Sequence, residues 1–223
     1  MNSFSRQKIL LESWQILKEN PVFIIGFFLF IFLISIAPNF LINGFSPEKE
    51  VVNDTPVTYQ ILIFILQIII SFVLIKVLLL LVDKKALNKE NILPTSQMFY
   101  NFTIGSIVYD IGLILLVMLM QKMGSAGIIA FLLFVYIILK FQFVNYIIID
   151  KNTTALTAFK ISNEITKNEL TEIFLLLMTL LFINIIGAIF FGIGLLLTMP
   201  VSVIAIVLLY RELIKKVSFE SEG

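Results

Sequence analysis

The sequence predicts an all-α integral membrane bundle with six transmembrane helices and interfacial amphipathic helices, all in one membrane domain. The first observation is composition: the 223 residues are 59% hydrophobic and 14% charged, with a mean hydropathy of +1.03. Soluble domains are about 45–50% apolar and about 25% charged. The second observation is six apolar runs of roughly 20 residues, the length needed to cross a hydrocarbon layer of about 30 Å. Lipid must therefore be the solvent for much of this chain.

The first segment, residues 5–20, has the periodicity of an amphipathic helix. Ile9 and Trp14 fall on one side of it, and Lys8 and Glu12 fall on the other. It carries too many charges to span a membrane. We predict an interfacial helix with Trp14 at the depth of the lipid headgroups; an ordinary soluble amphipathic helix is the alternative.

Six apolar runs follow this segment. The predicted spans cover residues 21–42, 59–82, 102–121, 126–149, 170–191 and 195–210. Pro21 suits the first turn of a helix, and Pro38 is expected to kink or end the first span. Gly192 and Gly194 allow a very short turn between the last two spans. A second interfacial helix is predicted over residues 152–168.

The basic residues indicate an orientation. In this scheme twelve of them fall on one side of the membrane: Arg6, Lys8, Lys18, Lys84, Lys85, Lys89, Lys151, Lys160, Lys167, Arg211, Lys215 and Lys216. Only Lys49 and Lys122 fall on the other side. Because basic loops stay on the cytoplasmic side, we predict a multi-pass protein of the cell membrane with both termini in the cytoplasm.

A weak internal repeat accompanies these spans. The pattern Leu10-x-x-Ser13-x-x-Ile16-x-Lys18 recurs as Phe159-x-x-Ser162-x-x-Ile165-x-Lys167, and Leu93-x-x-Ser96-x-x-Phe99 is a fainter third copy. Each copy precedes two spans. The chain is therefore predicted to consist of three units, each a surface helix followed by a helical hairpin.

Three charged residues lie inside predicted spans: Lys76, Asp110 and Lys140. A charge at bilayer depth costs at least about 2.5–3.5 kcal/mol on insertion scales, which makes each a candidate for function or for pairing. All three lie at similar depth on the cytoplasmic side. We favour an ion pair between Asp110 and Lys140 or Lys76. The alternatives are lysine side chains that reach the headgroups and a role in transport or proton handling.

Other residues are expected to join helices. Side-chain amides predicted to bond between helices are Gln142, Asn145 and Asn184. Glycines predicted to let helices approach closely are Gly105, Gly112 and Gly187.

Several kinds of chemistry are excluded by residue type. The chain has no cysteine and no histidine, which removes thiolate nucleophiles, imidazole acid–base catalysis and most zinc sites. No phosphate-binding loop or dinucleotide motif is present. We therefore predict no enzyme activity, no catalytic residue, no cofactor and no metal. The net charge of +1 argues against nucleic acid as a partner. The expected partners are the bilayer and either another membrane protein or further copies of the chain.

The second half resembles a known family. Its fourth span ends FVNYIIID, a connector TALTAFKISNEITKNELTEIF follows, and the chain closes with GAIFFGIGLLLTMPVSVIAIVLLYREL. These features, with Pro200 and Tyr210–Arg211, cover roughly the last 80 residues. They are similar to the membrane domain of glycerophosphoryl diester phosphodiesterases and its stand-alone relatives. The resemblance implies a multi-span helical domain beside, or fused to, lipid-related enzymes. The phosphodiesterase activity is not implied, because the chain has no room for the catalytic barrel.

Two functions follow as expectations. The first is a non-enzymatic accessory, scaffolding or lipid-interacting role in the membrane. The alternative is a small transporter or permease-like component, for export of, or immunity to, a membrane-active peptide. A water-filled cavity around Asp110 would favour transport, and a packed interior would favour a scaffold.

Overall fold

The structure is a computed structural model that describes residues 4–43, 57–122, 127–189 and 192–220, and within those ranges it consists of helices and short connections. The helices are α1 (Arg6–Glu19), α2 (Pro21–Asn43), α3 (Val57–Val82), α4 (Lys89–Ile92), α5 (Ser96–Lys122), α6 (Gly127–Phe141), α7 (Val144–Lys151), α8 (Ala155–Ile165), α9 (Leu170–Ile189) and α10 (Leu195–Glu220). Among the described residues, six segments are long and apolar enough to cross a membrane, with α6 and α7 counted together. The predicted fold class, a helical membrane bundle, is confirmed.

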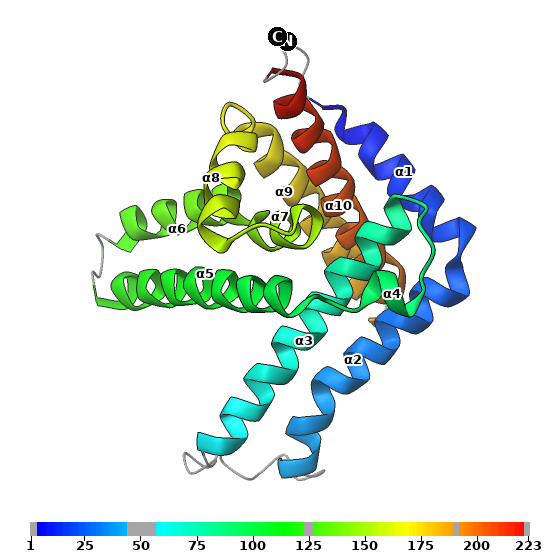
Figure 1. Cartoon of the computed structure of the whole chain (residues 1–223), viewed down its shortest axis with the longest axis horizontal. Helices are drawn as coiled ribbons and strands as arrows, with labels where there is room; N and C mark the ends of the chain where they lie inside the picture. Colours follow the sequence, from blue (N-terminus) through cyan, green and yellow to red (C-terminus); the bar gives the residue numbers. More distant parts are fainter. Residues whose placement is uncertain (1–3, 44–56, 123–126, 190–191, 221–223) are drawn as a thin grey trace.

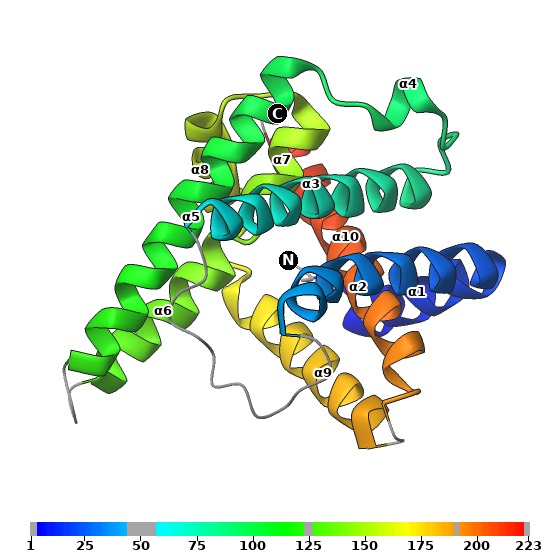
Figure 2. The ribbon, with the colours of Figure 1, turned by 90° about the horizontal axis from the view of Figure 1, so that it is seen from below.

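Three helical hairpins spread apart from a common point, which we call the vertex. The first hairpin is α2 and α3, the second is α5 and α6, and the third is α9 and α10. In Figure 1 the first hairpin points downwards and the second points to the left. In Figure 2 the third hairpin points to the lower right, whereas the second points to the lower left. The hairpins therefore meet only near the vertex.

The short helices link the hairpins in a ring. Helix α4 packs on α3, α8 packs on α6 and α7, and α1 packs on α10. Each short helix thus lies on the second half of a hairpin, and α1 closes the ring by lying on the last one. This arrangement agrees with the predicted three units. The third copy of the repeat was wrong in detail, because α4 covers only Lys89–Ile92 and the motif serine, Ser96, is the first residue of α5.

The two clear copies of the repeat share their burial pattern. Ser13 and Ser162 are both fully buried. Ile24 and Ile173, which lie eleven residues further along in each copy, are also buried. Corresponding positions of the two copies are therefore buried alike, both in α1 and α8 and in the helices that follow them, α2 and α9.

The core lies at the vertex. Phe72 of α3 meets the ring of Phe102 of α5 edge to face at 5.2 Å between centroids. Phe143 and Tyr210 are fully buried beside it. Towards the tips the hairpins expose apolar side chains such as Ile129, which only a lipid solvent tolerates over so large a surface.

Two helices extend beyond the spans predicted within them. Helix α5 begins at Ser96 rather than at 102, since Thr95 accepts a hydrogen bond from the Met98 amide and caps the helix before the apolar run begins. Helix α10 continues past 210 to Glu220. Pro38 does not end α2, which runs on to Asn43.

The predicted fourth span is interrupted. It consists of α6 and α7, which are separated at Gln142 and Phe143. The hydroxyl of Ser162 donates a hydrogen bond to the Lys140 carbonyl at 2.8 Å. Because this carbonyl accepts a hydrogen bond from a side chain of another helix, it does not need the regular bond from the backbone four residues later. Helix α8 thereby stabilises the break between α6 and α7.

Polar side chains join helices at two of the three predicted positions. Asn145 donates to Ser106 at 3.0 Å, and Asn184 donates to Ser202 at 2.7 Å. Gln142 instead donates to the carbonyl of Leu139, three residues earlier in its own segment, so the expectation for it was wrong.

Two of the three predicted glycine contacts are present. A Cβ on Gly105 would lie 2.7 Å from the Ile148 side chain, and one on Gly187 would lie 2.5 Å from the Thr198 hydroxyl oxygen. Gly112 has nothing within 4 Å of a Cβ position, so its prediction was wrong.

Candidate functional site

The strongest polar feature is a cluster at the vertex that we call the vertex cluster: Asp83, Asp150, Tyr210 and Arg211. Arg211 of α10 donates from Nη2 to Asp83 and lies with Nη1 at 2.8 Å from Asp150. Asp83 directly follows α3, and Asp150 is in α7. One guanidinium therefore joins the second helix of the third hairpin to segments from the other two.

The surroundings neutralise this cluster. Tyr210 donates its hydroxyl proton to Asp150 at 2.8 Å. Lys85 lies 3.2 Å from Asp83, and Lys151 lies 3.7 Å from Asp150. The side chains of Arg211 and of both aspartates are mostly buried. Because the carboxylates are already occupied by cations and donors, the vertex cluster is built to hold helices together.

Lys76 is the one predicted candidate close to this cluster. It lies on α3, two turns before Asp83, is partly buried and interacts electrostatically with Asp150. No ion pair within 4 Å is formed by Lys76 in the described part of the chain.

The favoured ion pair of Asp110 is absent from the structure. Among the described residues Asp110 forms no ion pair with Lys76, Lys140 or any other cation, and its side chain is exposed. The residue comes five positions after Gly105, whose face packs on α7. At 3.6 residues per turn that places Asp110 roughly 140° around the helix from this contact.

Lys140 has a different partner from the one predicted. Its Nζ donates to the hydroxyl of Tyr136, one turn earlier on the same helix, and lies 4.9 Å from the centre of that ring. A local aromatic partner satisfies the ammonium group within α6. The structure thus separates the three candidates instead of bringing them together.

The residues of the vertex cluster were missed as a site. Sequence analysis placed Arg211 among the basic residues of one face and gave no role to Asp83 or Asp150. A signal was available: each of the three charges follows directly on the apolar run of the second half of a predicted unit, in LLVD, IIID and LLYR. An alignment of the three repeat units that included the ends of their spans would have placed these three charged residues at corresponding positions.

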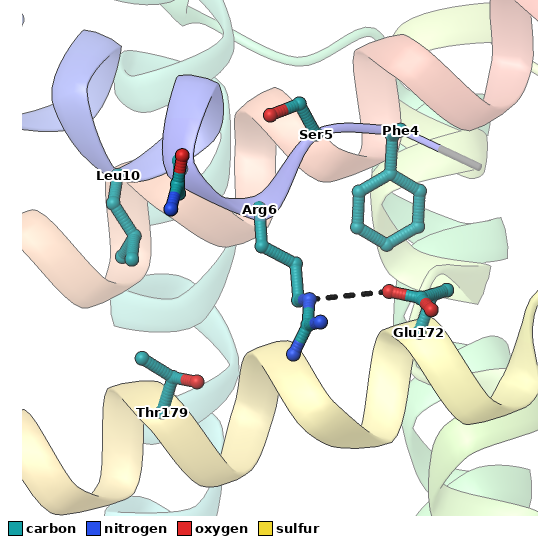
Figure 3. A pocket seen from close by; sticks show the side chains of 7 residues that line it. Phe4, Ser5, Arg6, Leu10, Glu172 and Thr179 are labelled. Carbon is teal, nitrogen blue, oxygen red and sulfur yellow. Dashed lines mark ion pairs between the residues drawn. The ribbon is translucent and has the colours of Figure 1, made fainter. Parts of the chain in front are cut away.

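A cavity of about 460 Å³ lies beside α1. Figure 3 shows Arg6 reaching across it from α1 to Glu172 of α9. The Nε of Arg6 lies 3.1 Å from a Glu172 carboxylate oxygen, and both side chains are partly exposed. In Figure 3 the terminal nitrogens of Arg6 extend past this contact, one of them on the side of Thr179.

A second cavity, of about 240 Å³, shares Leu10 with the first. It lies between α1 and the third hairpin. Apart from the hydroxyl of Thr198, its lining is apolar: Leu10, Trp14, Ile183, Leu197, Thr198 and Val201. The two cavities together form what we call the α1 groove, which is polar at the Arg6 end and apolar at the Trp14 end.

None of the four cavities found beside α1 and the vertex contains Asp110, Lys76 or Lys140. The described residues also hold no group of three or more acidic residues placed to bind a metal ion. Comparison with known protein families, with curated proteins and with solved structures found no match to this chain. The resemblance to the phosphodiesterase membrane domain therefore remains a prediction.

Proposed function

We propose that this chain is a non-enzymatic, lipid-interacting scaffold of the cell membrane. The observation that carries the proposal is the distribution of packing. The helices are tied together by the vertex cluster and by the core around Phe72 and Phe143. Beyond the vertex the hairpins diverge and expose apolar side chains (Figures 1 and 2). Such a shape offers a large surface to lipid and a firmly joined base.

The position of the basic residues supports an orientation. Helix α1, the segment after α3, and helix α8 all lie at the vertex end, and they carry the lysines Lys8, Lys18, Lys84, Lys85, Lys89 and Lys160. Lys122 ends α5 at the tip of the second hairpin, while Lys49 lies outside the described residues. By the positive-inside rule the vertex faces the cytoplasm, with both termini on that side.

Topology is directly testable because the chain has no native cysteine. Lys122→Cys and Lys89→Cys are compared in intact cells with a thiol reagent that does not cross membranes. The proposal expects labelling of the first variant from outside and of the second only after lysis. The reverse pattern would overturn the orientation.

The lipid-interacting role is tested on the purified full chain. We expect phosphate analysis to find phospholipid retained after detergent exchange. In vesicles loaded with a pH-sensitive dye, we expect proton flux no faster than in vesicles without protein. Absence of retained phospholipid would overturn the proposal.

Transport is the alternative, and the exposed carboxylate of Asp110 within a span is the observation that favours it. It predicts proton flux that Asp110→Asn abolishes. Such flux would favour the transporter hypothesis over the scaffold hypothesis. An oligomer would then be needed to enclose the path of the transported species.

A further inference from the structure

We infer that the α1 groove is a binding site for one glycerophospholipid, with its phosphate at Arg6 and an acyl chain along Trp14 and Ile183. This inference rests on the proposed lipid-interacting function and assigns it a specific site. Nothing in the vertex cluster is used for it.

The polar end of the groove has a donor suited to phosphate. Arg6 contacts Glu172 through Nε, and one of its terminal nitrogens points away from that contact, on the side of Thr179, which also lines the cavity (Figure 3). Guanidinium N–H groups form charge-assisted hydrogen bonds to phosphate oxygens, commonly in pairs. Glu172 holds the guanidinium in place and leaves the terminal donors for a ligand.

The apolar end has the chemistry of an acyl-chain site. Ile183 is in the middle of α9, and Leu197 and Val201 are on the facing side of α10. Trp14 and Leu10 of α1 line the opposite side of the groove. Leu10 lines both cavities, so the polar and apolar parts are adjacent.

The direction of this polarity matches that of a membrane lipid. Glu172 is in the first turn of α9, at the vertex end, whereas Ile183 is about 16 Å further along the helix at 1.5 Å per residue. A lipid in the surrounding leaflet has its phosphate at the interface and its chains below it. It enters the groove without turning over or leaving the bilayer. A soluble phosphate compound would fill only the Arg6 end.

The chain provides its own probe, since Trp14 is its only tryptophan and lines the apolar cavity. The full-length protein is reconstituted in vesicles of digalactosyldiacylglycerol, a bilayer lipid without phosphate. Phosphatidylcholine with brominated chains is then added in increasing proportion, and quenching of Trp14 fluorescence is measured. This lipid has no net charge, so general attraction to the basic face does not contribute.

The inference expects half-maximal quenching at a mole fraction several times lower than with brominated galactolipid. Arg6→Ala should raise that mole fraction about tenfold, as loss of a charge-assisted hydrogen bond predicts. The matched control is Lys8→Ala, which removes the same charge two residues away, outside the groove, and should leave quenching unchanged. Equal shifts for the two variants would overturn the inference.

Glu172→Gln separates binding from helix docking. This variant breaks the same ion pair as Arg6→Ala but leaves the guanidinium free. The inference expects quenching to be retained or strengthened, whereas a purely structural role of the pair predicts that both variants weaken it.

At the apolar end, Ile183→Phe should weaken quenching several-fold while the exposed Ile185→Phe does not. If proton flux refutes the scaffold, this binding test still stands; if only the quenching results fail, the scaffold stands and this site is refuted.

Discussion

Arg211 and Asp83 are 128 positions apart in the chain and meet at 2.8 Å at the vertex of the three hairpins. The same guanidinium also contacts Asp150, so a single side chain bridges all three units. The internal repeat explains why this point is polar. The three charged residues come at corresponding places, at the end of the second half of each unit. The units meet there, and no single hairpin contains both the cation and the carboxylates of the pair.

Arg211 should therefore be among the most sensitive residues to substitution. Arg211→Met leaves two mostly buried carboxylates without their shared partner, and we expect the free energy of unfolding to fall by about 3–5 kcal/mol. Denaturant unfolding in detergent measures this change. Lys18→Met, on the exposed face of α1, is the matched control and should have little effect. Adding Asp83→Asn and Asp150→Asn to Arg211→Met should restore part of the loss, and failure to do so would argue against the bridge.

Gly187 should tolerate no side chain. Gly187→Ala places a Cβ 2.5 Å from the Thr198 hydroxyl oxygen and 3.1 Å from the Gly194 backbone. We expect the third hairpin to open slightly and the free energy of unfolding to fall by about 1–3 kcal/mol. Gly112→Ala is the control: it meets open space in a helix interior and should be neutral or stabilise by up to about 1 kcal/mol. Equal effects for both glycines would contradict the close contact.

The two repeat serines should differ, although both are fully buried. Ser162 donates to the Lys140 carbonyl, across 22 residues, whereas Ser13 donates only to Leu10 of its own helix. Ser162→Ala should lower the free energy of unfolding by about 1–3 kcal/mol, because it removes the main donor to that carbonyl. Ser13→Ala should cost less than half as much. Hydrogen exchange at residues 142–147 should rise in the Ser162 variant alone; unchanged exchange there would refute the support of the helix break by α8.

Neutralising Asp110 should not lower stability, in contrast to the substitution of Arg211 in the vertex cluster. It has no ion pair among the described residues and its side chain is exposed, so Asp110→Asn removes the cost of a charge at bilayer depth without leaving an unpaired lysine. We expect stability and abundance in the membrane to stay the same or increase, as measured by denaturant unfolding and quantitative immunoblotting. A loss as large as that of Arg211→Met would restore the discarded pairing hypothesis.

The sequence predicted much of the local structure for simple physical reasons. Six runs of membrane length, the amphipathic pattern of residues 5–20 and the serine repeat each depend on neighbouring residues only. That Asn145 and Asn184 bond to another helix was also predictable, because an amide inside a span needs a partner, but the sequence did not identify the partners, Ser106 and Ser202. Two errors had different causes. The break in the fourth span depends on Ser162, which lies 22 residues away in the chain. Lys140 was assigned a distant partner, Asp110, but its hydrogen-bond partner is Tyr136, four residues away on its own helix.

By itself, then, the sequence determined that the chain is a helical membrane protein of three similar units, since hydropathy and periodicity are properties of contiguous residues. Only the tertiary structure decided which charges matter. The pairing of Arg211 with Asp83 and Asp150, and of Arg6 with Glu172, depends on how far each hairpin turns from its neighbours. That rotation is set by side-chain packing at the vertex, to which distant segments contribute together and which no single stretch of sequence encodes.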